Sequence, residues 1–249
     1  MEVKDLASKM TATSQDLDST GVSESINLEM EKYFLEGIPF QYLLEESEFY
    51  HHKYFVNKSV LIPRPETEYL VDIIVNEMKG KARRVLDVGT GSGVILCSLL
   101  SHGVGDGGVG VDISRDALNV AEKNLKKLKL EKKAQLILSD RLQNVEGSFD
   151  LIVSNPPYIK AQSHRDMVHS SVDKFEPQIA LYLPDDFYVL WFEDFFHEIR
   201  SHLKGSFFME GHELEVEDQA RMLHQLGFSE IKVLKDLCGA NRYIRASYP

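Results

Sequence analysis

The sequence predicts an α/β protein built on one mostly parallel sheet, and two patterns lead to this prediction. Beyond residue 84, short runs rich in Val, Ile and Leu alternate with segments of helical periodicity, as in parallel sheets that helices cover on both faces. The last two apolar runs, 231–237 and 242–246, are separated by four residues, a connection that allows only antiparallel pairing. We therefore expect a Rossmann-like sheet with an antiparallel hairpin at its C-terminal edge.

The N-terminal part is predicted to be a small appendage of helix and β-hairpin. Residues 11–25 are rich in Ser, Thr and Asp, which indicates a flexible segment, and 26–37 regain a helical pattern that Gly37 closes. Alternating aromatic and polar residues at 49–62 predict a hairpin. The expected parts are a short helical or flexible region at 1–36, a β-hairpin connecting module at 37–65 and a larger domain at 66–249.

The larger domain is predicted to begin with a helix and to continue as alternating strands and helices. Pro63 and Pro65 end the preceding strand and start a helix over 66–79, because proline fits the first helical turn. The further expected strands are 85–88, 108–113, 134–138, 149–154 and 206–210, and the further expected helices are 93–100, 116–128, 185–203 and 213–226.

Composition excludes several classes of function. Lys and Arg number 28 against 39 Asp and Glu, a net charge of −11, whereas wrapping duplex DNA requires cationic side chains. Cys97 and Cys238 are too few for a disulfide scaffold or a four-cysteine zinc site. His197 and His202 are five positions apart, about 140° around a helix, so no metal site is expected. We expect a cytoplasmic monomer with no membrane partner and no stable nucleic-acid partner.

A glycine turn follows the first strand of the larger domain. Residues 85–93 read VLDVGTGSG, and ligands of open α/β sheets bind beyond the carboxyl ends of the strands. The spacing differs from the G-x-G-x-x-G of dinucleotide sites and lacks the lysine of phosphate loops. Asp112 ends the next strand, where a carboxylate accepts both ribose hydroxyls, and Asp140 follows the third. The pattern favours S-adenosylmethionine over NAD; a tight turn beside a solvated Asp is the alternative.

The fourth strand leads into Asn155-Pro156-Pro157-Tyr158. Two prolines remove two N–H donors, so Pro156 offers only its carbonyl oxygen, held by a fixed φ. Asn155 adds a side-chain carbonyl, and two rigid acceptors hold both hydrogens of a planar NH₂ group while its lone pair faces a sulfonium methyl. Tyr158 adds an aromatic face that attracts a cation. The tetrapeptide indicates methyl transfer to an amide or exocyclic amine; a proline-rich strand exit is the alternative.

These motifs resemble those of a known family. The tetrapeptide NPPY after DVGTGSG is similar to class I amino-methyltransferases. Residues 37–68, which contain LIPRPETE, resemble the module ahead of the catalytic domain in the HemK/PrmC protein-(glutamine-N5) methyltransferases. The likeness covers about residues 37–246 and implies that 66–249 form a class I S-adenosylmethionine-dependent catalytic domain.

The resemblance implies an activity and a set of site residues. The activity is methyl transfer from S-adenosylmethionine, with S-adenosylhomocysteine as product, to the side-chain N5 of the glutamine in the Gly-Gly-Gln motif of peptide chain release factors, which act in translation termination. The implied catalytic residues are Asn155, Pro156 and Tyr158. The implied substrate-binding residues are Asn155, Pro156, Pro157, Tyr158, Arg64 and Glu66. The implied cofactor-binding residues are Asp87, Gly89, Thr90, Gly91, Ser92, Gly93, Asp112, Ile113, Asp140, Arg141 and Asn155.

The sequence departs from the family in two places that bear on these implications. The region ahead of Gly37 is shorter than usual, and Arg141 stands where the family tends to place an apolar or aromatic residue against the adenine.

Two other functional classes stay open. NPPY is shared with adenine-N6 DNA and guanine-N2 RNA enzymes, so an exocyclic base nitrogen is the alternative acceptor. The charge of −11 and the lack of a basic or aromatic strand-binding module speak against it. The third class is an idle binding protein of the same fold, against which the intact residues 155–158 speak.

Overall fold

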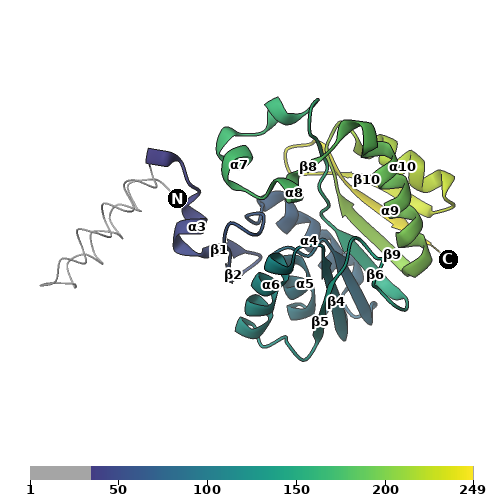
Figure 1. Cartoon of the computed structure of the whole chain (residues 1–249). Coiled ribbons are helices and arrows are strands. Elements are labelled where there is room, and N and C mark those ends of the chain that lie inside the picture. The colour runs from purple at the N-terminus through teal and green to yellow at the C-terminus, as the bar shows by residue number, and fades with distance from the viewer. Residues whose placement is uncertain (1–34, 249) are drawn as a thin grey trace, which may run out of the picture.

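The computed structural model describes residues 35–248 (Figure 1). The predicted flexible segment at 11–25 and most of the predicted helix at 26–37 lie outside these residues.

A seven-stranded sheet forms the centre of the molecule, in the order β10-β11-β9-β6-β3-β4-β5. Neighbouring strands from β9 to β5 pair in parallel, whereas β11 runs antiparallel to both β9 and β10. The predicted sheet with an antiparallel C-terminal edge is therefore confirmed. Its strands are β3 (Arg84–Val88), β4 (Gly107–Asp112), β5 (Ala134–Leu138), β6 (Phe149–Ser154), β9 (Leu203–Glu210), β10 (Ser229–Lys235) and β11 (Asn241–Ser247).

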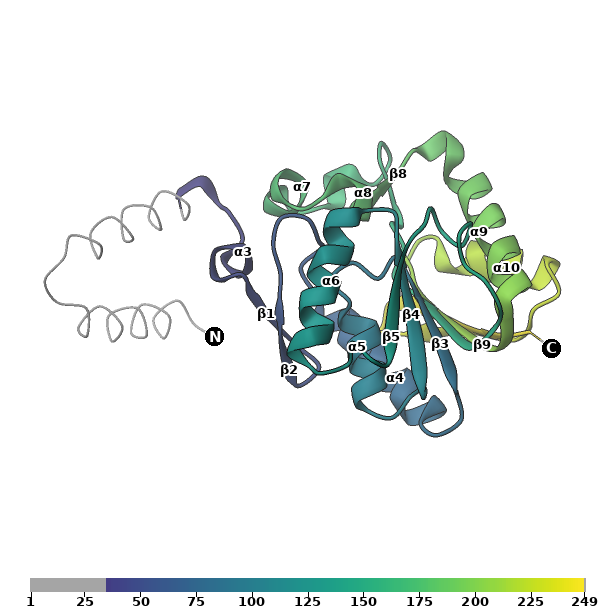
Figure 2. The same ribbon diagram turned by 60° about the horizontal axis from the view of Figure 1, so that its bottom comes forward.

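Two layers of helices cover the sheet (Figure 2). Side chains alternate between the faces along a strand, so Leu151 and Val153 of β6 pack on one layer and Ile152 on the other. Burial on both sides explains the continuous apolar runs of these strands. None of the helices in the described residues is long and apolar enough to cross a membrane. One layer holds α4 (Pro65–Met78), α5 (Val94–Ser101) and α6 (Arg115–Lys127), and the other holds α9 (Tyr188–His202) and α10 (Val216–Gln225).

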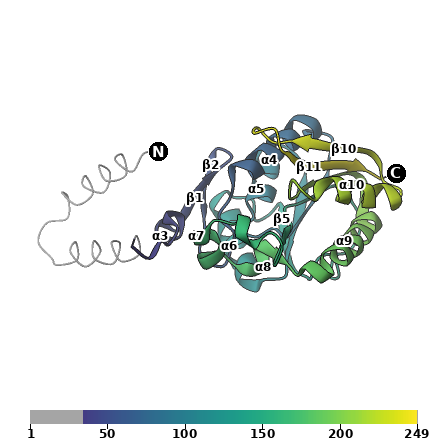
Figure 3. The ribbon, with the colours of Figure 1, turned by 90° about the horizontal axis from the view of Figure 1, so that it is seen from above.

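A β-hairpin precedes the sheet and lies beside α5 and α6 (Figure 3). It consists of β1 (Glu46–Phe49) and β2 (His52–Phe55), after the short helix α3 (Phe40–Leu44). Phe49 and Tyr54 of this hairpin are buried in the same core as α4 and α5. The predicted hairpin is confirmed, while the boundary between a module at 37–65 and a domain at 66–249 stays a prediction.

The hairpin strands lie earlier in the chain than the predicted range 49–62. The expectation of strand beyond residue 55 is wrong, because the segment that follows β2 pairs with no strand of the described residues. Asn124 of α6 accepts from the Phe55 N–H at 2.7 Å and donates to the Phe55 carbonyl at 2.9 Å, and the Ile62 N–H donates to Glu176 at 3.0 Å. The apolar residues Val56 and Val60 are buried against α6 without belonging to a strand.

The stretch between β6 and α9 folds into short elements, which lie above the sheet in Figure 1. The predicted helix over 185–203 opens with a 3₁₀ turn at Asp185–Phe187 before α9 begins. The predicted helix over 213–226 starts one turn late, at Val216. The short elements are β7 (Ile159–Lys160), α7 (Ser170–Phe175), α8 (Gln178–Leu181) and β8 (Tyr182–Leu183).

Candidate active site

A cavity of about 230 Å³ opens beyond the carboxyl ends of β3, β4 and β6, where sheets of this type bind ligands. Many of the predicted site residues line it. These are Arg64, Gly89, Thr90, Gly91, Ser92, Asp112, Ile113, Asp140, Arg141, Asn155, Pro156 and Pro157. Thr67, Trp191 and Phe195 also line the cavity. None of them is a predicted site residue: Thr67 follows Glu66 on α4, and Trp191 and Phe195 lie on α9, far from the motifs in the chain.

The glycine turn has the backbone shape that the sequence predicts. Gly89 and Gly91 have φ values of 71° and 54°, which favour glycine and leave room for a ligand beside the backbone. Gly93 lies behind the turn, at φ 78°, where a Cβ would stand 3.1 Å from the Cβ of Ala121 on α6. The structure thus places Gly93 in the packing of two helices, outside the cavity wall.

Asp87 also lies behind the turn and outside the cavity wall. Its carboxylate is fully buried and accepts from the Thr90 hydroxyl at 2.7 Å and from the Leu96 N–H at 3.3 Å. Burial raises the pKa of Asp87 to about 7, against the effect of these hydrogen bonds. Through these two hydrogen bonds Asp87 stabilises the conformation of the glycine turn from its buried side.

The carboxylate of Asp112 lines the cavity directly beside the glycine turn. It accepts from the Gly91 N–H at 2.9 Å and from the Ser114 N–H at 2.9 Å. Burial raises the pKa of Asp112, while the backbone N–H bonds act in the other direction. Each carboxylate oxygen accepts more than one hydrogen bond, so both keep capacity for a pair of ligand hydroxyls.

Arg141 is held by α9. Its guanidinium lies 3.2 Å from Glu198 and 3.8 Å from Asp194, and its central carbon lies 5.7 Å from the ring centre of Trp191. The guanidinium is thus engaged by acidic side chains, and Trp191 supplies an aromatic surface in the same cavity wall.

A second cavity, of about 240 Å³, adjoins the first. Leu61, Arg64, Asn155, Pro156 and Ala180 line both cavities, so the tetrapeptide stands at their junction. The rest of the second wall is formed by Tyr158, Ile159, His164, Met167, Val168, Val172, Leu181, His212 and Arg242.

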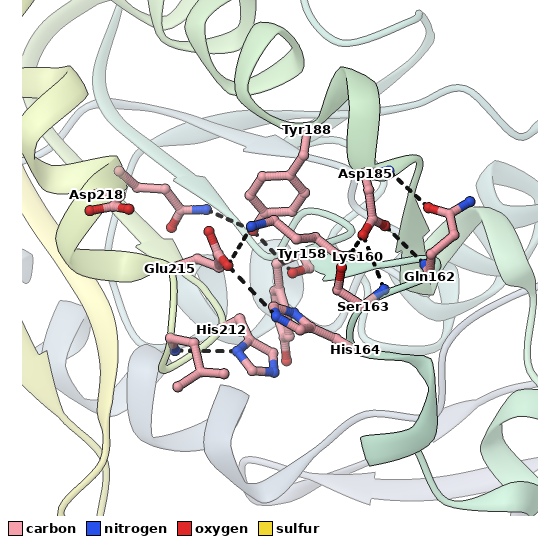
Figure 4. Close-up of polar contacts among 12 residues, drawn as sticks. Tyr158, Lys160, Gln162, Ser163, His164, Asp185, Tyr188, His212, Glu215 and Asp218 are labelled. Carbon is pink, nitrogen blue, oxygen red and sulfur yellow. Dashed lines mark hydrogen bonds and ion pairs between the residues drawn. The ribbon is translucent and has the colours of Figure 1, made fainter.

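Two stacked histidines form part of the second wall (Figure 4). The rings of His164 and His212 are 4.5 Å apart with an interplanar angle of 22°, and Glu215 accepts from Lys160 at 2.6 Å beside them. The Leu214 N–H donates to Nδ1 of His212 at 3.2 Å, so neutral His212 carries its proton on Nε2. Burial, His164 and Arg242 lower the pKa of His212, which favours its neutral form, in which Nδ1 is occupied and Nε2 is the donor.

The segment ahead of α4 is attached to the segment after the tetrapeptide. Buried Glu176 accepts from the Arg64 guanidinium at 2.5 Å and from the Ile62 N–H at 3.0 Å. Arg64 thereby lines both cavities, and its role in binding stays a prediction. Glu66, by contrast, is exposed on α4 and lines neither cavity. Thr67, one residue further along the helix, faces inward, because consecutive residues point about 100° apart.

Comparison with known proteins identifies one family model, two relatives and one solved structure. The Methyltransferase small domain family matches residues 65–178. The release factor glutamine methyltransferase of Bacteroides thetaiotaomicron is 35% identical over 215 residues, 84% of this chain and 76% of that protein. That of Flavobacterium psychrophilum is 32% identical over 221 residues, 86% and 76%. A solved methyltransferase from Pyrococcus furiosus is 16% identical with a TM-score of 0.56, covering 92% of this chain and 98% of that one, a likeness of fold alone.

Proposed function

This chain belongs to the release factor glutamine methyltransferase family, and from that membership we propose that it methylates the side-chain nitrogen of a glutamine in peptide chain release factors, with S-adenosylmethionine as donor. The observation that carries the proposal is the position of Asn155 and Pro156 at the junction of two cavities. A donor in one cavity and an amide in the other would meet there.

The residues of the first cavity suit the donor. When bound, S-adenosylmethionine supplies a sulfonium methyl group and leaves as S-adenosylhomocysteine. At Gly89 and Gly91 no side chain projects from the turn, so a ligand can approach the backbone there, and the Asp112 carboxylate has accepting capacity for the ribose hydroxyls. Trp191 and Ile113 provide apolar surface for the adenine ring.

The residues at the junction suit a glutamine amide. The lone pair of an amide nitrogen is delocalised, which makes it a poor nucleophile. Asn155 Oδ1 and the Pro156 carbonyl would accept its two hydrogens and hold the nitrogen in line for transfer. Leu61 and Ala180 supply apolar surface for the methylenes of the glutamine.

The nitrogen must also lose a proton during or after transfer. His212 has its Nδ1 occupied by the Leu214 N–H, so we propose that water takes the proton. A pH–rate profile is then expected to lack a sharp essential pKa near neutrality.

A cytoplasmic location follows from a substrate of the translation machinery, and a monomeric state stays a prediction.

The proposal is tested by transfer of a labelled methyl group to a purified release factor. The control is the same factor with its Gly-Gly-Gln glutamine replaced by alanine. Label on the first protein and none on the second is the expected result. Label on neither, with donor binding demonstrated, would overturn the proposed acceptor, and an RNA or DNA oligonucleotide would then be tested in its place.

Asp112→Ala is expected to weaken donor binding by roughly 30-fold, because hydrogen bonds to a charged acceptor contribute about 2 kcal/mol. Trp191 is the single tryptophan of the chain and lines the cavity, so its fluorescence on titration with S-adenosylhomocysteine reports the affinity. Asp140→Ala, at an exposed residue of the same wall, is the control and should change the affinity less. Parent-like affinity in Asp112→Ala would contradict the assignment of the ribose site.

A further inference from the structure

A buried carboxylate stands directly behind the tetrapeptide. Glu210, at the end of β9, is 1% exposed. It accepts from the Tyr158 hydroxyl at 3.0 Å and from the Thr67 hydroxyl at 2.8 Å. The Thr67 oxygen in turn accepts from Nδ2 of Asn155 at 3.1 Å. A chain of hydrogen bonds therefore runs from the core of the protein to the side chain at the junction of the two cavities.

The direction of each bond in this chain follows from the chemistry of Glu210. An ionised carboxylate accepts hydrogen bonds and cannot donate them, so the hydroxyl of Thr67 has to donate to it. The Thr67 oxygen is then left as an acceptor, and the only part of the Asn155 side chain that can donate to it is the NH₂ group. With Nδ2 turned toward Thr67, Oδ1 faces the other way.

The charge on Glu210 is balanced from several sides. Burial and the neighbouring Glu66 raise the pKa of Glu210, whereas the hydroxyls of Thr67 and Tyr158 and the positive charge of Arg242 lower it. Arg242 is itself held by Asp236 at 3.2 Å. These partners provide the compensation that a buried carboxylate requires.

We propose that Glu210 and Thr67 are positioning residues that fix the amide orientation of Asn155, so that Oδ1 and not Nδ2 is presented to the acceptor. This inference rests on the proposed function, because orientation matters only if Asn155 receives a hydrogen from a substrate NH₂ group. A reversed Asn155 amide would place two donors face to face and lose one of the two bonds that hold the acceptor nitrogen.

The sequence offered no indication of this arrangement, because Thr67 and Glu210 are 143 positions apart. The sequence predicts Glu66, not Thr67, as the site residue of this segment. Glu210 reaches the tetrapeptide only through its hydrogen bonds to Thr67 and Tyr158, which the tertiary structure creates. The same carboxylate also holds Tyr158, so both side chains that the tetrapeptide presents depend on one buried group.

The test compares Thr67→Val with Thr67→Ser, both at a position that is 4% exposed. Valine keeps the shape of threonine without its hydroxyl, whereas serine keeps the hydroxyl. Thr67→Val is expected to lower kcat roughly 10- to 100-fold, with KM for the release factor and the affinity for S-adenosylhomocysteine within about twofold of the parent. Thr67→Ser should stay within about threefold in kcat. A parent-like kcat in Thr67→Val, or equal losses in both variants, would overturn the proposal.

A second measurement does not depend on the reaction. The side-chain NH₂ signals of Asn155 are identified in the ¹⁵N correlation spectrum by their loss in Asn155→Ala. They should shift in Thr67→Val and in Glu210→Gln, and stay near their parent positions in Thr67→Ser. Unchanged signals in Thr67→Val would refute the proposed hydrogen-bond chain from Glu210 through Thr67 to Asn155, even in an active enzyme. Shifted signals in a protein that does not label the release factor would refute the proposed function but would still support this hydrogen-bond chain.

Discussion

Asn155→Ala is expected to lower kcat for methyl transfer by roughly 10²- to 10³-fold, the usual effect of removing one preorganised hydrogen-bonding group from an active site. Asn155 lies where the two cavities meet, and its Oδ1 would hold one of the two hydrogens on the acceptor nitrogen. Without it, the nitrogen keeps only the Pro156 carbonyl and rotates away from the donor. The measurement is steady-state transfer to a release factor, with donor affinity followed by Trp191 fluorescence.

The matched control is Asn119→Ala, at an exposed position of α6 that lines neither cavity. It should leave kcat and donor affinity unchanged. Parent-like transfer by Asn155→Ala would contradict the role of the tetrapeptide. Donor binding with no transfer by the parent protein would instead favour a protein that binds the donor without using it. A loss of donor affinity as large as the loss of kcat would instead place Asn155 mainly in the donor site.

Glu176→Ala is expected to lower the free energy of unfolding by about 3 kcal/mol. The substitution removes the acceptor for both the Arg64 guanidinium and the Ile62 N–H. The backbone group is then buried without a partner, and a partly buried cation loses its counter-charge. Because Arg64 and Leu61 line both cavities, activity should fall together with stability. Urea unfolding at constant pH measures the effect.

Glu46→Ala serves as the control for this second prediction. It removes the Lys53 ion pair at 2.7 Å in the same N-terminal segment, where the Lys53 side chain is 60% exposed. Exposed pairs of this kind contribute at most about 1 kcal/mol. If the two variants unfold at the same urea concentration, then Glu176 does not fasten the segment ahead of α4 to the rest of the molecule.

The sheet was predictable because its central strands β3, β6 and β9 are buried on both faces. Such strands read as short apolar runs, and the alternation with amphipathic helices identifies them without any tertiary information. The prediction of strand beyond residue 55 was wrong because the apolar residues there are buried against a helix and not within a sheet. Val56 and Val60 are apolar because they pack on α6, although neither belongs to a strand.

The sequence alone determined the glycine turn, Asp112 and the tetrapeptide as candidate site residues, since each is a local pattern at the end of a strand. The tertiary structure alone decided which further residues join them. Thr67 and not Glu66 faces the cavity, because one step along a helix turns a side chain by about 100°. Which side of α4 faces inward is set by its packing on the sheet. Glu210, Glu176 and Trp191 reach the site from distant elements. Their positions depend on how layers pack, which local periodicity does not encode.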